Sequence, residues 1–172
     1  MADYIVESKS RKDLRNLAET LRRFLKLENE PRVPIVELLD VFTQVFEDFN
    51  YEIVPDYALP SGVHAETDIR TGHITIKESV YEGACDGEGR DRMTIAHEIG
   101  HYFTLSFCGF SLQRNYSHQK VKPYNDPEWQ AKCFAGEFMV PHHLTNDMSP
   151  DEIVEACGVS YDAASYQYNH RN

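Results

Sequence analysis

The chain has 172 residues, of which 41% are hydrophobic and 26% are charged, and this composition suits a single domain over residues 1–172. Its formal net charge of −11 argues against binding to nucleic acids or to anionic membranes, which needs clustered Lys and Arg. The basic stretch Arg11–Lys26 is interrupted by Asp13 and Glu19, as in a solvated helix face. The four cysteines contain no CxxC pair, and signal or transmembrane patterns are absent. We therefore expect a cytoplasmic protein with reduced thiols.

The first half of the chain predicts two helices and then three strands. Leucines at three- and four-residue spacing predict a helix over about residues 10–28, and a second helix begins near Pro34 and ends near Phe46. Short runs bounded by turn signals predict strands at 51–54, 63–68 and 73–77. The glycine-rich segment Gly83–Gly89 is expected to be a solvated loop, since its acidic ladder is too short for calcium.

The second half predicts mainly helices. They are expected over residues 90–106, from near Pro127 to just before Pro141, from Ser149 to about Cys157, and from Ser160 toward Tyr168. The segment 153–160 resembles a DNA-reading helix-turn-helix in pattern but lacks a basic recognition face, so we expect it to pack within the domain. Cys133 and Cys157 lie in apolar patterns and are expected to be small core residues.

The predicted helix 90–106 contains the pattern HExxH, formed by His97, Glu98 and His101. On a helix, positions i and i+4 share one face, so both imidazoles can reach one metal ion. Glu98 is rotated by about 100° from His97, which suits it to hold a water molecule and accept its proton rather than to act as a ligand. The flanking residues are apolar, and a buried histidine pair needs partners such as a metal. Gly100 within the pattern indicates that another element packs closely there.

A catalytic zinc site uses three protein ligands and leaves one position open for water or substrate. The candidates for the third ligand are His118, Glu128, Glu137, His142 and His143. Glu128 lies in the first turn of the helix that is predicted to start near Pro127. Glu137 lies nine residues later (137 − 128) and therefore about half a turn away around the helix, so the two cannot both face the metal.

Two blocks of sequence resemble the ImmA/IrrE family of metallopeptidases. The block Arg92–Tyr102, RMTIAHEIGHY, resembles the family helix R-x-x-x-A-H-E-(L/I)-G-H, and Glu128–Pro141 is similar to its helix E-x-x-A-(N/D)-x-F-A-x-x-(L/F)-(L/M)-(M/V)-P. The resemblance covers roughly residues 34–165. It implies a gluzincin-like Zn²⁺ site with His97, His101 and Glu128 as ligands and Glu98 as the catalytic base. It also implies a helix-turn-helix repressor as the partner that is cleaved or inactivated.

The expected fold is α+β, with a small, mostly antiparallel sheet packed beside the zincin-like active helix and surrounded by helices. The expected function is that of a zinc metallopeptidase acting on a repressor. The alternative is a non-hydrolytic binding module, such as an antirepressor or a component of a toxin–antitoxin module, and a structural zinc domain with a fourth protein ligand is a third possibility. Lys132 stands where the family often has Asn or Asp, and it cannot accept a hydrogen bond from a zinc-bound histidine.

Two further expectations concern the substrate. The oxyanion donor stays open among His118, Tyr124 and His143. The strand His73–Lys77 is expected to lie at a sheet edge above the metal and to bind an extended peptide through main-chain hydrogen bonds, with an interior position as the alternative. The net charge of −11 favours a basic protein partner.

Overall fold

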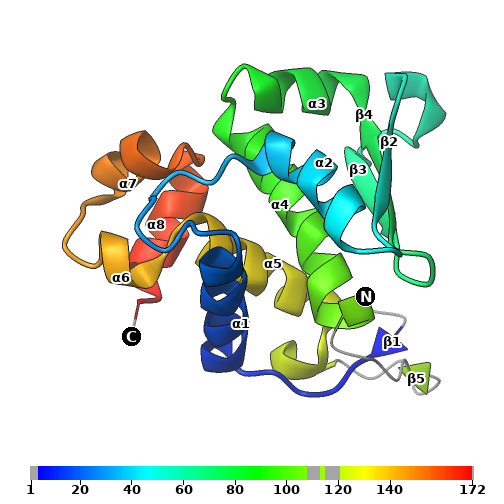
Figure 1. The fold of residues 1–172 in the computed structure, drawn as a ribbon. Helices are drawn as coiled ribbons and strands as arrows, with labels where there is room; N and C mark the ends of the chain where they lie inside the picture. Colours follow the sequence, from blue (N-terminus) through cyan, green and yellow to red (C-terminus); the bar gives the residue numbers. More distant parts are fainter. Residues whose placement is uncertain (1–3, 108–112, 115–120, 172) are drawn as a thin grey trace.

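The structure is a computed structural model that describes residues 4–107, 113–114 and 121–171. A central helix, α4, runs through the molecule with α5 beside it, and the sheet lies on one side of α4 while α1 packs against α5 (Figure 1). The C-terminal helices α6, α7 and α8 gather at one end of the molecule (Figure 1). The helices are α1 (Arg11–Phe24), α2 (Ile35–Val45), α3 (Glu78–Cys85), α4 (Gly89–His101), α5 (Pro127–Met139), α6 (His142–Thr145), α7 (Pro150–Cys157) and α8 (Tyr161–Asn169).

The main sheet has the strand order β2-β4-β3. Its strands are β2 (Asn50–Val54), β3 (Ala65–Asp68) and β4 (His73–Lys77). β4 pairs in parallel with β2 and antiparallel with β3. The predicted α+β class is confirmed, and the sheet beside α4 is mixed. A second, two-stranded antiparallel pair joins β1 (Tyr4–Ile5) to β5 (Gln113–Arg114), which the sequence patterns did not predict.

The position of His73–Lys77 within the sheet differs from the edge position expected from the sequence. As β4, this strand is paired on both sides, so the edge prediction was wrong and the interior alternative is correct. Ile74 and Ile76 are both fully buried, as expected of a central strand packed against helices. Among the described strands, β3 is the one at the edge nearest α4, and it contacts that helix.

The segment Gly83–Gly89 is mostly helical, so the predicted loop was wrong over most of its length. Its first three residues end α3 and Gly89 begins α4, which leaves a connection of only three residues, 86–88. A Cβ at Gly83 would lie 2.1 Å from the Oδ2 atom of Asp91. The glycine therefore allows α3 to approach α4 closely, and this packing outweighs its low intrinsic helix propensity.

The other predicted helices are present, with shifted ends. Helix α1 stops at Phe24 because Lys26 adopts a left-handed conformation with φ of 58°. The predicted helix 90–106 is α-helical to His101 and then continues as a π-helical segment, Tyr102–Phe107. Helix α7 begins with the expected capping box, in which the Ser149 hydroxyl accepts from the Glu152 amide and the Glu152 carboxylate accepts from the Ser149 amide.

The core extends from α1 and α2 across α4 to α5 and the sheet. Cys133 and Cys157 are buried in it, as predicted, and burial raises the pKa of both thiols to about 11, so they stay protonated. In the part of the chain that the structure describes, none of the helices has both the length and the apolar character needed to cross a bilayer.

Candidate metal centre

Helix α4 places the side chains of His97 and His101 on one face, one turn apart. Their Nε2 atoms lie 3.1 Å from each other, and their rings meet edge to face with centroids 4.7 Å apart. The surroundings are largely buried, since Ile95, Ala96 and Ile99 on the same helix are fully enclosed. The helix therefore holds two converging nitrogen atoms in a mostly apolar setting.

Helix α5 contributes the third side chain because it crosses α4 at very short range. A Cβ at Gly100 would lie only 2.7 Å from the carbonyl oxygen of Ala131, so the close packing expected at this glycine is present. Glu128 lies nearly one turn before Ala131, and Asp126 caps the helix by accepting a hydrogen bond from the Glu128 amide at 3.0 Å. The crossing and the cap together bring the Glu128 carboxylate over the two imidazoles.

The carboxylate of Glu128 reaches both histidines. Its Oε2 atom lies 3.3 Å from Nε2 of His97, and its Oε1 atom lies 3.3 Å from Nε2 of His101. Hydrogen bonds with His101 and then His97 hold the pKa of Glu128 well below its usual value, although burial opposes the shift. The carboxylate is therefore ionised in this arrangement.

These separations fit a metal ion. A tetrahedral zinc site with ligands at about 2.0–2.1 Å separates its ligand atoms by about 3.3 Å. The three measured distances of 3.1, 3.3 and 3.3 Å are close to that value. Two imidazole nitrogens and one carboxylate form the nitrogen and oxygen donor set of catalytic zinc sites, and these converging acceptors need a cation or shared protons to be stable together.

Glu98 lies beside this group and is held by the edge strand. The side chain is 7% exposed, and its Oε2 atom accepts a hydrogen bond of 2.7 Å from the Thr67 hydroxyl of β3. The same hydroxyl lies 3.2 Å from the main-chain carbonyl oxygen of Glu98. Thr67 thus fixes the side chain expected to serve as the base. Sequence reasoning missed this residue, because strand alternation does not show which helix lies opposite a strand.

The three elements enclose an open cleft of about 670 Å³. Its walls are β3 and the loop before it, the metal-facing side of α4, and the first turns of α5. His97, Glu98, His101 and Glu128 all line this cleft. A substrate can therefore approach both the candidate metal ligands and the candidate base.

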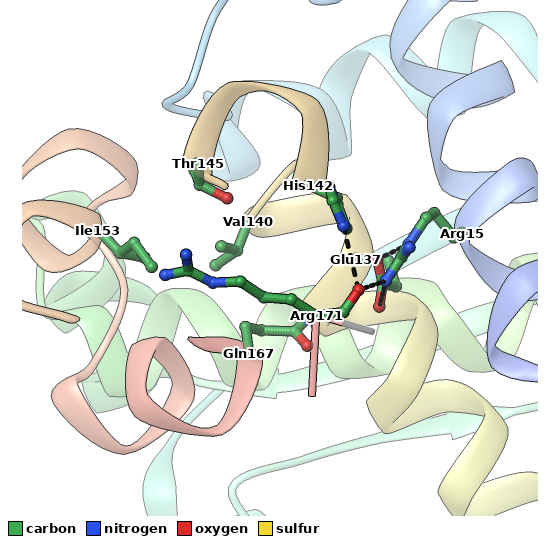
Figure 2. A pocket seen from close by; sticks show the side chains of 8 residues that line it. All are labelled: Arg15, Glu137, Val140, His142, Thr145, Ile153, Gln167 and Arg171. Carbon is green, nitrogen blue, oxygen red and sulfur yellow. Dashed lines mark hydrogen bonds and ion pairs between the residues drawn. The ribbon is translucent and has the colours of Figure 1, made fainter. Parts of the chain in front are cut away.

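Three other side chains considered as third ligands, Glu137, His142 and His143, lie elsewhere. Glu137 is on the opposite face of α5, where it forms an ion pair of 2.6 Å with Arg11. It forms a second ion pair, of 2.8 Å, with Arg15 (Figure 2). The Nε2 atom of His142 lies 3.0 Å from the carbonyl oxygen of Arg171 (Figure 2). His143 contacts the carbonyl oxygen of Glu28 at 2.8 Å. His118 lies outside the described residues.

The two described candidates for the oxyanion donor, Tyr124 and His143, do not line the cleft. Tyr124 packs edge to face on Trp129, with ring centroids 5.2 Å apart, and it does not line the cleft. His143 contacts the carbonyl oxygen of Glu28 instead, and His118 lies outside the described residues.

The Nδ1 atom of His101 is buried and has no hydrogen-bond partner among the described residues. That part of the chain therefore contains no group that would orient the imidazole ring through this atom.

Residues 54–169 match the family of IrrE N-terminal-like domains, Peptidase_M78. The chain belongs to this family. The match begins in β2, so it includes Thr67, the whole of α4 and the whole of α5, and it leaves α1 and α2 outside. Membership supports a peptidase-like protein at the level of the family.

The fold is also found in solved structures. A Mycobacterium tuberculosis transcriptional regulator superposes with a TM-score of 0.59 and 14% sequence identity, covering 90% of this chain and 46% of that protein. The chain thus spans about half the length of that regulator, and at this identity the likeness concerns the fold alone. A search of curated proteins gives no match.

Proposed function

We propose that the chain is a zinc-dependent metallopeptidase that cleaves a protein partner. The observation that carries this proposal is the convergence of His97, His101 and Glu128 in an open cleft, with the buried carboxylate of Glu98 beside them. Family membership supports the same reaction class. A closed structural zinc site would use a fourth protein ligand, and among the described residues the cluster contains three.

In this proposal, His97, His101 and Glu128 hold the zinc ion. When bound, zinc would polarise the scissile carbonyl and lower the pKa of water, so that water can lose a proton and attack near neutral pH. Glu98 accepts the proton of the attacking water and delivers it to the leaving amine. Thr67 orients Glu98 through its hydrogen bond of 2.7 Å, and burial keeps competing solvent away from the carboxylate.

The edge of β3 is the surface that we propose for the substrate backbone. Ala65, Glu66 and Thr67 line the cleft, and β3 is paired with β4 on only one side among the described strands. An extended peptide can add to such an edge through main-chain hydrogen bonds, which places its carbonyls along the cleft. This role passes from His73–Lys77 to Ala65–Asp68, because the former is the interior strand.

The proposed partner is a helix-turn-helix repressor. The resemblance to the ImmA/IrrE family supports this choice, and so does the net charge of −11, which complements the basic surface of a DNA-binding protein. Cleavage or capture of such a protein would release the genes that it represses.

A pair of substitutions tests the reaction. Glu98→Gln should retain zinc, because Glu98 is not a ligand, and should abolish hydrolysis, because an amide cannot accept the proton. His97→Ala should lose both. Zinc content would be measured by atomic absorption. Cleavage would be measured by incubating the zinc-loaded protein with any helix-turn-helix protein encoded near its gene and following the products by mass spectrometry.

A non-hydrolytic binding module is the second candidate. Two features favour it: among the described residues Nδ1 of His101 has no hydrogen-bond partner, and Lys132 cannot orient a zinc-bound histidine. Unchanged release of repression by the Glu98→Gln variant in cells would support this candidate and contradict the peptidase.

A further inference from the structure

The cleft lined by His97, His101 and Glu128 is called the metal cleft below. A second cavity, of about 340 Å³, adjoins it. Thr94, His97 and Lys132 line both spaces, so the cavity is a neighbour of the reacting centre. It extends along α4 toward Arg90, near the first turn of that helix, and reaches α5 and the residue before α8. A peptide bound across the proposed metal site would therefore place a side chain near this cavity.

The inner surface of this cavity is mostly apolar. Met93 lies one turn before His97 on α4, and Ala135 on α5 is 1% exposed. The two hydroxyls in the lining have local partners: that of Thr94 donates to the carbonyl of Arg90 at 3.1 Å, and that of Ser160 accepts from the amide of Ala163 at 3.3 Å. The inner surface thus suits an apolar side chain.

The rim of the cavity is cationic. Lys132 and Arg90 are exposed, and the described residues that line the cavity include no carboxylate. Lys132 forms neither a hydrogen bond nor an ion pair with any residue in the described ranges. The guanidinium of Arg90 contacts the Nε2 atom of His64 at 3.1 Å, which does not neutralise it. Two cations without a carboxylate partner among the described residues therefore line this cavity, in a protein whose net charge is −11.

We propose that this cavity is a substrate pocket for a peptide segment that carries an apolar side chain next to a carboxylate, and that Lys132 determines this specificity. The apolar side chain would pack against Met93 and Ala135, and the carboxylate of Asp or Glu would pair with Lys132 and Arg90 at the rim. The inference rests on the proposed function, since it names the substrate class of the same site.

A role in selecting an acidic side chain would explain why Lys132 differs from the family pattern. The family often has Asn or Asp at this position, and Asp would place a negative charge where this chain has a positive one. Because an exposed ion pair is weak, the discrimination is modest, and we expect about a fivefold preference for acidic over basic side chains.

A random mixture of short peptides tests the pocket in two ways. Zinc-loaded wild-type protein would be incubated with the mixture, and mass spectrometry of the products would give the residues that flank the cut bond. Separately, the peptides retained by immobilised, zinc-loaded Glu98→Gln protein would be sequenced, which reports binding without hydrolysis. Both should show Asp or Glu beside an apolar residue about five times more often than Lys or Arg.

Three variants assign the preference to Lys132. Lys132→Glu should reverse the preference toward Lys and Arg, and Lys132→Met, which keeps a long apolar side chain, should remove most of it. Lys12→Glu is the matched control, because it changes the net charge equally on an exposed part of α1 and lines neither cavity. The zinc content of each variant would be measured, and Lys132→Met decides the result if Lys132→Glu loses the metal.

The outcomes separate this inference from the function on which it rests. Cleavage with the same flanking residues in wild type and Lys132→Met would overturn the pocket and leave the peptidase standing. Retention with the acidic preference but no cleavage would support the pocket and overturn the peptidase in favour of a binding module. Neither cleavage nor retention of any peptide would overturn both.

Discussion

Thr67 connects the sheet to the proposed base, Glu98. Its hydroxyl donates to Glu98 at 2.7 Å, and the acceptor is 7% exposed, so little water is available to replace this bond. A carboxylate that must hold water and accept its proton works best in one orientation. The strand edge therefore contributes a positioning residue as well as a surface for the peptide backbone.

Substitution of Thr67 tests this positioning role. Thr67→Val keeps the shape but removes the donor, and we expect the turnover of a cleaved peptide to fall about tenfold with little change in KM. Thr67→Ser retains the hydroxyl and should recover most of the turnover. Zinc content should equal that of wild type in both variants. Normal turnover in Thr67→Val together with a loss in Thr67→Ser would show that the methyl group, and hence packing, is what matters.

At the level of elements, the metal centre depends on how closely α4 and α5 cross. Gly100 allows the carbonyl of Ala131 to approach to a distance that no side chain at this position would permit. This contact determines the height of Glu128 above the two histidines. The Arg11 and Arg15 guanidiniums hold the far face of α5 through Glu137, so α1 supports the same helix from the other side.

Gly100→Ala should separate the two helices. A new Cβ 2.7 Å from a main-chain oxygen forces a backbone shift costing about 1–3 kcal/mol in the free energy of unfolding, which exceeds the gain of about 1 kcal/mol from better helix propensity. We also expect weaker zinc binding, measured by competition with a chelator. The control is Gly136→Ala on α5, where the new Cβ meets the movable amide of Gln167 and zinc affinity should stay unchanged. Wild-type zinc affinity in Gly100→Ala would show that the crossing does not set the site.

At the level of the whole molecule, two electrostatic effects act at different ranges. The net charge of −11 creates a field that attracts basic proteins over about one Debye length. Lys132 and Arg90 reverse the sign locally at the cavity beside the metal cleft. The overall surface would thus bring a basic partner to the protein, while the pocket would select an acidic side chain within it.

This division predicts a specific dependence on salt. The association rate with a basic repressor should fall by about tenfold between roughly 50 and 500 mM salt, because long-range attraction is screened. The preference for acidic short peptides should weaken much less, since it depends on contact distances. Stopped-flow or surface-based binding kinetics would measure the first quantity and peptide retention the second. An association rate that does not change with salt would show that the net charge does not determine the choice of partner.

The sequence by itself determined the parts that depend on local spacing. The pattern from Arg92 to His101 predicts a helix with two imidazoles on one face, whatever packs around it. The half-turn offset between Glu128 and Glu137 showed that only one of them could lie on the side of the two histidines, and the structure places the carboxylate of Glu128 beside them. Capping at Ser149 and the burial of Cys133 were likewise predictable, because they follow from neighbouring residues and apolar pattern.

The tertiary structure alone decided what lies opposite each predicted face. Periodicity reports that a strand is buried but not how many neighbours it has, so His73–Lys77 and Ala65–Asp68 could not be ranked as edge strands. Thr67 contacts Glu98, which lies far from it in the sequence. Lys132 lines two cavities together with residues from other, distant segments. Gly83 illustrates the same limit, because only the approach of Asp91 from α4 explains a glycine inside a helix. Local pattern sets which side of an element is apolar or polar, whereas packing between elements decides which partner that side meets.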